Sequence, residues 1–464
     1  MGISDLKSKS RLRFRAVFFA IMATGVLSAA VYWFNFKIQM FVTPSSEGFQ
    51  FYVLIILLLS TFYFTAVFLV CEILPGKEKS RWLTGFIVFF AIIFRLCLIA
   101  PEPVVLSKDV YRYIWDGRVQ QSGINPYLHP PGGEELKHLR DEKIFPNINR
   151  KDSPTLYPAG AQVFFRMFHF LVGDSVTGFK ALMVFFDISS LLVLTGLLRI
   201  WGFNSARLII YAWNPLVIFE IAYSGHLEGI MVFLMIAALY LHATQKKMAA
   251  VIMLALSAAV KLYPALLLVA FLNRGDRLKG IVAFSATIIL LYAPFIGAGT
   301  KVSGFLPVYL KNPYESFNTG LKYLLMRLFP GLDYHVLSWL FIASLAIAGL
   351  AVFFKDKNTL QTTRYGYILT GCLMILMPAS LHPWYVIMVI PFLVIYPNPA
   401  WLIFTGTVNL SYLKYTSPQG IMPIWVLLVE YLPLFVILTT GSIIGRYRHR
   451  RQPILPVPAV TTER

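Results

Sequence analysis

A short polar stretch, residues 107–118, holds the side chains best suited to chemistry. It reads SKDVYRYIWDGR, with two carboxylates and two arginines close together. Its pattern predicts a helix, and at helical spacing Asp109, Arg112 and Asp116 share one face. A carboxylate can take a proton from a hydroxyl group, and Arg can bind phosphate through two parallel hydrogen bonds. The alternative is a helix lying on the membrane, with its Tyr and Trp residues as interfacial anchors. That alternative explains Asp109 less well than a functional role does, and it explains Asp116 equally well.

Three other polar motifs stand between apolar runs, around His226 and Glu228, around Lys261, and around His382. Lys261 interrupts the apolar run 248–272, and an ionisable residue inside such a run marks a functional site by default. Snorkelling of its side chain to the interface is the alternative. His226 and Glu228 are equally consistent with helix capping. His382 is either an interfacial anchor or a ligand of phosphate or sugar hydroxyls, and the second interpretation is favoured.

The composition identifies the kind of element that must position these residues. The chain has 464 residues, of which 57% are hydrophobic and only 14% are charged. Soluble chains carry roughly 25% charged residues, so this chain lacks the polar surface of a soluble protein. The apolar runs are each about 20 residues long, which is the length that crosses a bilayer. We therefore expect an all-α integral membrane protein, a single polytopic helical bundle over residues 1–464.

The net charge of +19 is explained by topology. Lys and Arg collect at the cytoplasmic ends of membrane spans, so a basic balance here indicates no nucleic-acid partner. This rule predicts 12 to 14 crossings with both termini in the cytoplasm, including a basic cytoplasmic tail at 445–464. The expected crossing segments are 16–36, 50–73, 82–100, 180–199, 204–223, 227–243, two short helices meeting near Lys261, 280–297, 335–354, 365–380, 384–397, 400–413 and 421–444.

Residues 101–157 form the strongest change of composition in the chain. They hold 8 of the 22 acidic residues and 8 Lys or Arg. Charge parity places this segment outside the cytoplasm as a large first loop. The following apolar stretch, 158–172, is too short to cross comfortably and is expected to be a re-entrant or interfacial helix. The polar motifs, together with residues 312–318, then all fall on the outer face.

The motifs resemble those of the GT-C glycosyltransferase superfamily. The resemblance is carried by Ser107-Lys108-Asp109-Val110-Tyr111, by Gly123-x-Asn-Pro-Tyr127, by Pro154-Thr155-x-Tyr157-Pro158 and by the motifs at 225–228, 261–264 and 382–385. It covers most of residues 80–400 and is nearest to the polyprenyl-phosphate-mannose-dependent mannosyltransferases, including the glycosyltransferase 87 group and GPI mannosyltransferase I. Departures are two extra spans before the loop, Tyr111 in place of a second acid, and Glu228 where Asp is more usual.

The resemblance implies an inverting hexosyltransferase that moves one sugar, mannose by analogy, from a polyprenyl-phosphate donor to a hydroxyl acceptor on the extracytoplasmic face. Asp109 is then the general base. The leaving phosphate needs cations more than an acid, and the candidates are Arg112, Arg118, Lys261 and His382. The residues expected to contact substrate are Asp116, Tyr113, Asn125, Tyr127, Tyr157, His226 and Glu228.

The expected partners are the lipid-linked donor, the bilayer and an acceptor that is a glycolipid, a polysaccharide or a protein. The expected location is a bacterial inner or plasma membrane. A divalent metal is compatible with this chemistry but not demanded, because the acidic residues and His226 have no metal-site spacing. Two alternatives are a transporter or flippase of lipid-linked substrates, and a ligase that moves whole glycans. A transporter would be expected to show repeated halves and charges deep in several spans. This chain shows neither, apart from Lys261, Arg95 and Arg166 near span ends or in short helices.

Overall fold

The computed structural model describes residues 3–39, 46–73, 80–103, 106–307, 317–378, 380–417 and 420–449. Within these ranges every regular element is helical, as the sequence predicts. Lipid offers no hydrogen-bond partners to the backbone, and a helix satisfies its own N–H and C=O groups within one segment. Residues 312–315 and 450–464, which the topology prediction included, lie outside the described part of the chain.

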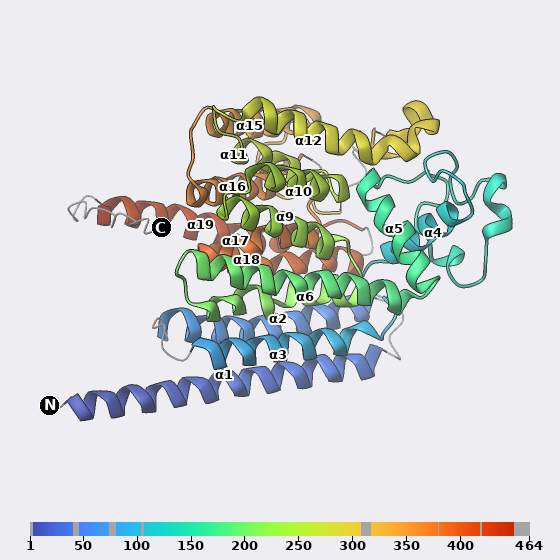
Figure 1. The fold of residues 1–464 in the computed structure, drawn as a ribbon. Helices are drawn as coiled ribbons and strands as arrows, with labels where there is room; N and C mark the ends of the chain where they lie inside the picture. Colours follow the sequence, from blue (N-terminus) through green and yellow to red (C-terminus); the bar gives the residue numbers. More distant parts are fainter. Residues whose placement is uncertain are drawn as a thin grey trace.

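The N-terminal third contributes three long helices that lie side by side (Figure 1). Helix α1 spans Ile3–Gln39, α2 spans Ser46–Phe68 and continues as a π-helical turn at Leu69–Ile73, and α3 spans Ser80–Ile99. They correspond to the first three predicted crossings. Helix α1 begins at the end of the bundle from which the last helix, α19, also leaves (Figure 1).

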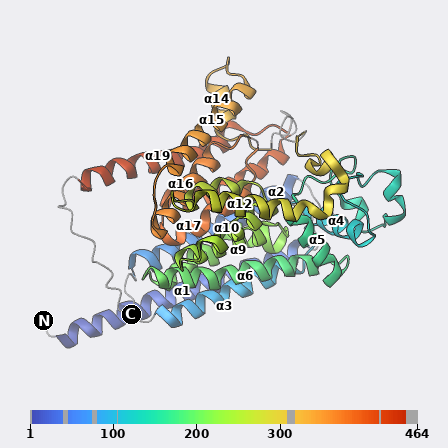
Figure 2. The same cartoon turned by 45° about the horizontal axis from the view of Figure 1, so that its top comes forward.

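The loop after α3 folds into a small helical cap at the opposite end of the bundle (Figures 1 and 2). It contains α4, Asp109–Gln121, two 3-10 turns at Glu134–Leu139 and Phe145–Asn147, and α5, Ala159–Val172. Helix α5 is the segment predicted to be re-entrant or interfacial, and it packs against α4 rather than lying within the bundle. Gly117 permits this close approach, because a Cβ there would lie 2.5 Å from the backbone oxygen of Phe165.

The middle of the chain returns through the bundle with two breaks. Helix α6 spans Val176–Ile200. The next predicted crossing is a pair of helical segments, Ser205–Ala212 (including α7) and Pro215–Tyr223 (including α8), which meet at an angle of 58°. Asn214 accepts a hydrogen bond from the backbone N–H of Leu216 and so begins the second segment. Helix α9 then spans Glu228–Ala243.

The C-terminal half completes the bundle with shorter helices. Helix α10 ends at Val260, directly before Lys261, so the predicted break is present. The remaining elements are the 3-10 turn Tyr263–Leu267, α11 Leu268–Phe271, α12 Arg277–Tyr292 with a 3-10 extension Ala293–Ser303, α14 Leu321–Leu328, α15 Tyr334–Phe353, α16 Thr359–Ile375, the 3-10 turn Pro383–Val389, α17 Ile390–Ile395, α18 Pro399–Thr407, the 3-10 turn Val408–Thr416 and α19 Ile424–His449.

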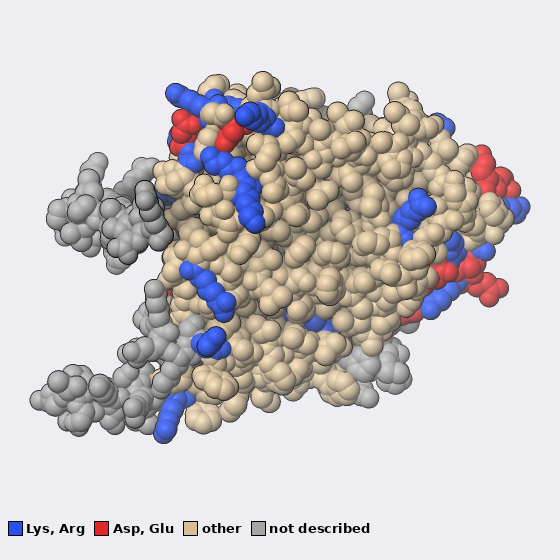
Figure 3. Space-filling model, in the orientation of Figure 1, with Lys and Arg blue, Asp and Glu red and all other residues tan. Residues whose placement is uncertain are grey.

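The helices confirm a polytopic membrane protein. Among the described residues, seven helices are long and apolar enough to cross a bilayer, the bent pair forms an eighth candidate, and four shorter apolar helices lie among them. Charged side chains stand mainly at the two ends of the visible face, and the band between them is nearly free of charge (Figure 3). The count of 12 to 14 crossings stays a prediction, because it requires the shorter helices to cross.

One buried ion pair ties the bundle together and gives a stability prediction. Arg95 of α3 pairs with Asp187 of α6, both side chains are fully buried, and Tyr211 donates a hydrogen bond to Asp187 over 2.7 Å. Arg95 also donates to the carbonyl of Ala212 at the helix break. Asp187→Asn should lower the free energy of unfolding by about 3–5 kcal/mol, because it leaves a buried guanidinium without its counter-charge.

Thermal unfolding in detergent checks this prediction. The control is Asp174→Asn, because Asp174 is half exposed and pairs with Arg118 at the surface. Its loss should cost about 1 kcal/mol or less. Equal shifts for the two variants would contradict the importance of the Arg95 pair.

Candidate active site

A cavity of about 860 Å³ opens between the cap and the bundle. Its walls come from the start of α4, residues 149–158, the break after α10, and the segments around Phe317 and His382. One part of the wall is apolar, with Leu156, Leu262, Leu306, Leu373 and Met377. The charged and polar side chains in the lining are Ser107, Lys108, Asp109, Arg112, Asn149, Arg150, Ser153, Tyr157, Lys261, Tyr263, His382, Tyr385, Tyr412, Lys414 and Tyr415.

Asp109 is the first residue of α4 and reaches this cavity. Its side chain is 18% exposed, Asn149 donates a hydrogen bond to its Oδ1 over 2.7 Å, and Nδ1 of His226 lies 3.9 Å from its Oδ2. Asp109 is therefore a carboxyl group that is exposed to the cavity, as a general base must be.

Arg112 lies one turn further along the same face, as the helical spacing predicts, and also lines the cavity. Its Nε donates to Asp116 over 2.9 Å and its Nη1 to the carbonyl of Ser153 over 3.1 Å. Asp116 is buried behind it and accepts a second hydrogen bond from Gln162. Asp116 thus fixes the orientation of Arg112 and does not itself line the cavity.

Arg118 does not reach the cavity, although the sequence suggested it as a phosphate ligand. It follows Asp109 by nine residues, which at 100° per residue places it on the opposite face of α4. There it pairs with Asp141 and Asp174, at 3.0 Å each. Burial alone would raise the pKa of Asp141, but hydrogen bonds from Arg118 and from the backbone N–H groups of residues 144–145 lower it to about 2. Arg118 therefore holds the cap together.

The break after α10 brings Lys261 to the cavity. Lys261 has extended backbone angles, and its Nζ lies 2.9 Å from Oε1 of Glu228. Tyr263 donates to the same oxygen over 2.8 Å, and Glu228 is fully buried at the start of α9. The buried carboxylate of Glu228 holds the ammonium group of Lys261 at the cavity wall. Lys261 therefore lines the cavity, and Glu228 lies behind it.

An aromatic stack connects the two predicted histidines. His382 stacks on Trp384 with ring centroids 4.3 Å apart, and Trp384 stacks on His226 at 4.2 Å. On its other side His382 stacks on Phe317 at 4.8 Å. His382 lines the cavity, whereas His226 is fully buried behind Asp109 and Trp384.

The tyrosines of the cap support the cavity wall. Tyr157 lines the cavity, and Tyr127 donates to its carbonyl oxygen over 2.8 Å. Tyr113 is buried behind Tyr157, with ring centroids 5.0 Å apart. Tyr113, Tyr127 and Tyr157 were all predicted to contact substrate, and of these three only Tyr157 lines the cavity.

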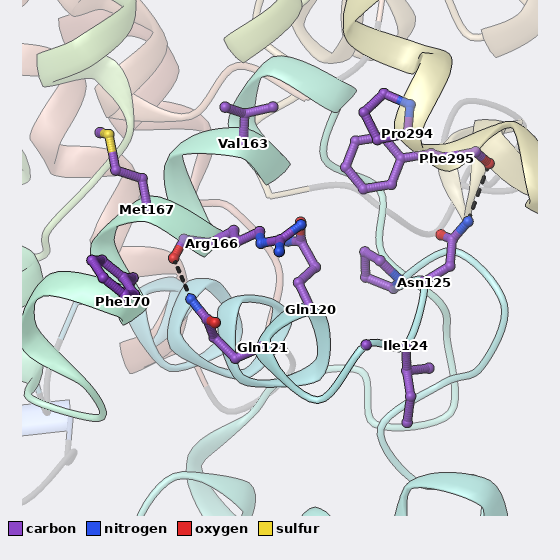
Figure 4. A pocket seen from close by; sticks show the side chains of 12 residues that line it. Gln120, Gln121, Ile124, Asn125, Val163, Arg166, Met167, Phe170, Pro294 and Phe295 are labelled. Atoms are coloured by element: carbon purple, nitrogen blue, oxygen red, sulfur yellow. Dashed lines mark hydrogen bonds between the residues drawn. The ribbon is translucent and has the colours of Figure 1, made fainter.

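Asn125 lies at a second hollow of about 640 Å³ between α4, α5 and the end of α12 (Figure 4). Its amide donates to the carbonyl of Phe295 over 3.1 Å, and Gln121 donates to the carbonyl of Arg166 over 3.1 Å. The amide side chains in this hollow thus hold the chain together, and Asn125 is separated from Asp109.

Glu220 is a site residue that was not predicted from the sequence. It is fully buried in the π-helical turn Phe219–Tyr223, with Oε2 3.3 Å from Nε2 of His226 and Oε1 accepting from Tyr412 over 2.8 Å. The signal that identified Lys261, an ionisable residue inside an apolar run, also applies to Glu220. Within the described residues, no group of three or more His, Cys, Asp or Glu side chains is placed to hold a metal ion.

Comparison with known families bears on what this cavity does. Residues 14–274, more than half of the chain, match the family described as Alpha-(1->6)-mannopyranosyltransferase, N-terminal domain. The chain belongs to this family. Comparison with curated proteins and with solved structures gave no match.

The protein is therefore a membrane mannosyltransferase, with a sugar donor and an acceptor as substrates. This agrees with the glycosyltransferase predicted from the sequence and favours it over the transporter alternative. The matched range includes Asp109, Arg112, His226 and Lys261, and it ends before His382. Most of the cavity's charged wall thus belongs to the part of the mannosyltransferase that carries the family likeness.

Proposed function

We propose that this mannosyltransferase moves one mannosyl residue from a polyprenyl-phosphate donor to a hydroxyl group of its acceptor. The observation that carries the proposal is the cavity in which a carboxylate, Asp109, and two held cations, Arg112 and Lys261, face an apolar wall. Such a wall suits a prenyl chain, and the cations suit the phosphate to which it is attached. The arrangement is the one that the resemblance to the GT-C superfamily leads us to expect.

In the proposed reaction the acceptor oxygen attacks the anomeric carbon while Asp109 takes the hydroxyl proton. The bond between that carbon and the phosphate oxygen breaks, and polyprenyl phosphate leaves with the bonding electrons. Arg112 binds the phosphate through its planar guanidinium, and Lys261 acts as a point charge. The imidazole ring of His382 also lines this cavity. A single displacement of this kind inverts the configuration of the sugar.

The inversion constrains the donor. The family description suggests an α-(1→6) product, and one inverting displacement yields an α linkage only from a β-linked donor. We infer a polyprenyl-phosphate β-mannose donor and transfer to a 6-hydroxyl group. We also propose that the cap, with its share of acidic residues, lies outside the cytoplasm of a bacterial plasma membrane. The opposite end of the bundle, where α1 begins and from which α19 leaves (Figure 1), would then face the cytoplasm.

Purified protein in proteoliposomes tests this function. The donors are polyprenyl-phosphate β-mannose, its α-anomer, polyprenyl-phosphate glucose and GDP-mannose, each offered with glycolipid, mannan oligosaccharide and peptide acceptors. We expect transfer from the β-mannosyl lipid alone and an α-(1→6) linkage by NMR of the product. Comparable turnover with GDP-mannose, or none with the lipid donor, would overturn the proposal.

A further inference from the structure

We propose that His226, held by Glu220, receives the proton that Asp109 takes from the acceptor hydroxyl. The inference rests on the proposed function, because it concerns the route of that proton. It assigns His226 and Glu220 as positioning residues that act through Asp109 and do not touch substrate.

The three side chains form a line from the cavity into the bundle. Asp109 faces the cavity, with Oδ2 3.9 Å from Nδ1 of His226. Nε2 of the same ring lies 3.3 Å from Oε2 of Glu220, which is an ion-pair distance without the alignment of a hydrogen bond. The separation at Asp109 is longer than a hydrogen bond, and catalytic hydrogen bonds commonly shorten only when substrate is present. Protonation of Asp109 supplies the missing donor, so a small rotation of its carboxyl group closes the line.

The backbone around residues 219–226 holds this line in place. The π-helical turn Phe219–Tyr223 carries Glu220, and the backbone N–H of His226 donates to the carbonyl of Glu220 over 3.0 Å. Gly225 has a φ of +73°, which residues with a side chain rarely adopt. The turn at Gly225 lets the side chains of His226 and Glu220 meet. Trp384 stacks on the imidazole and fixes its plane.

The charges also point to a proton-accepting role. Glu220 is fully buried, and in the described part of the chain His226 is the basic side chain with which it forms an ion pair. A buried carboxylate is costly unless it is paired and hydrogen-bonded. Tyr412 supplies a hydrogen bond, and an imidazolium would supply the charge. An imidazolium formed at His226 would therefore have a counter-charge 3.3 Å away.

The proton balance is simple. In the resting state Nε2 of His226 carries its hydrogen toward ionised Glu220, and Nδ1 presents a lone pair toward Asp109. Asp109 takes the acceptor proton during the displacement and donates it to Nδ1. The ring then lies as an imidazolium between two carboxylates. After the products leave, the proton returns through Asp109 to water in the cavity, and one proton has moved at each step.

Glu220→Gln tests the proposal, because it keeps the shape and one hydrogen-bond acceptor and removes the charge. We expect kcat to fall by about 10²-fold with KM for the donor unchanged. The acid limb of the kcat–pH profile should move to lower pH, because a neutral amide cannot stabilise a positive charge on the ring. The other titratable or charged groups around this line are Tyr52 of α2, Arg112 and Tyr113 of α4, Tyr157, Lys261, His382, and Tyr412 of the 3-10 turn Val408–Thr416.

Glu430→Gln is the matched control. Like Glu220, Glu430 is a buried acid that accepts a hydrogen bond from a neutral side chain. Its donor is the amide of Asn318, over 2.9 Å, and it does not pair with His226. Its variant should keep the wild-type kcat and pH profile. If Glu220→Gln does not purify as a folded protein, His226→Gln replaces it and should show the same loss of kcat.

Each outcome decides the proposal. A wild-type kcat, or an unchanged pH profile with lowered thermal stability, would show that the pair is only a structural tie and overturn it. The failure is distinct from failure of the proposed function. An inactive Asp109→Asn variant together with a normal Glu220→Gln variant rejects the proton route alone, whereas an active Asp109→Asn variant rejects Asp109 as the base.

Discussion

Asp109→Asn should reduce mannosyl transfer by about 10³-fold or more, because the amide cannot accept the acceptor proton. The substitution is nearly isosteric and keeps an oxygen toward Asn149, which donates to Asp109 over 2.7 Å. The start of α4 and the cavity wall should therefore keep their shape. The loss should appear in kcat, since the carboxylate acts in the transition state and contributes little to binding the neutral acceptor.

The measurement is the initial rate of transfer in proteoliposomes, with donor binding measured separately. Asp152→Asn is the control, because Asp152 is an exposed acid of the same loop and does not line the cavity. It should transfer at the wild-type rate. Turnover of Asp109→Asn within a few-fold of wild type would remove Asp109 from the mechanism.

Lys261→Met should lower kcat/KM for the lipid donor by about 10²-fold, because it removes a charged contact worth about 1.5–3 kcal/mol. It should also lower the thermal stability. Oε1 of Glu228, which is fully buried, lies 2.9 Å from the ammonium group, and removing one partner of a buried pair leaves an uncompensated charge.

A double variant separates these two effects. Lys261→Met combined with Glu228→Gln removes both charges, so the thermal stability should recover while donor binding stays weak. Thermal unfolding and donor titration of the three variants measure the two properties side by side. Recovery of transfer in the double variant would show that Lys261 serves only to neutralise Glu228 and does not bind the phosphate.

Local sequence patterns were sufficient for the elements that carry the site. The apolar run lengths predicted the membrane helices, and Lys261 predicted the break at which α10 ends, because both properties depend on neighbouring residues and on the solvent. The same holds for Asp109 and Arg112, whose common face follows from helical spacing within α4. The number of crossings does not follow from such patterns, because several helices, such as α10 and α17, are shorter than a bilayer requires.

The direction of the Arg118 side chain depends on contacts between segments that are distant in the sequence. Arg118 stands in the same motif as Asp109, yet its side chain pairs with Asp141 and Asp174 on the far side of α4. Helical spacing places Arg118 on the face of α4 opposite Asp109, but it does not show which of the two faces borders a cavity. The direction of the side chain depends on which surface α4 packs against, and α5 and the 134–147 turns decide that.

The α-helical membrane fold follows from the amino-acid sequence, because hydropathy and helical period are local properties. The acidic loop and the mannosyltransferase-like motifs are also visible in the sequence. Which ionisable groups meet depends instead on the packing of distant segments. Asp109, His226 and Glu220 come from two segments about a hundred residues apart, and their line exists because the cap packs on the broken helix that ends at Tyr223. Burial, which gives that line its chemistry, arises only when those segments exclude water together.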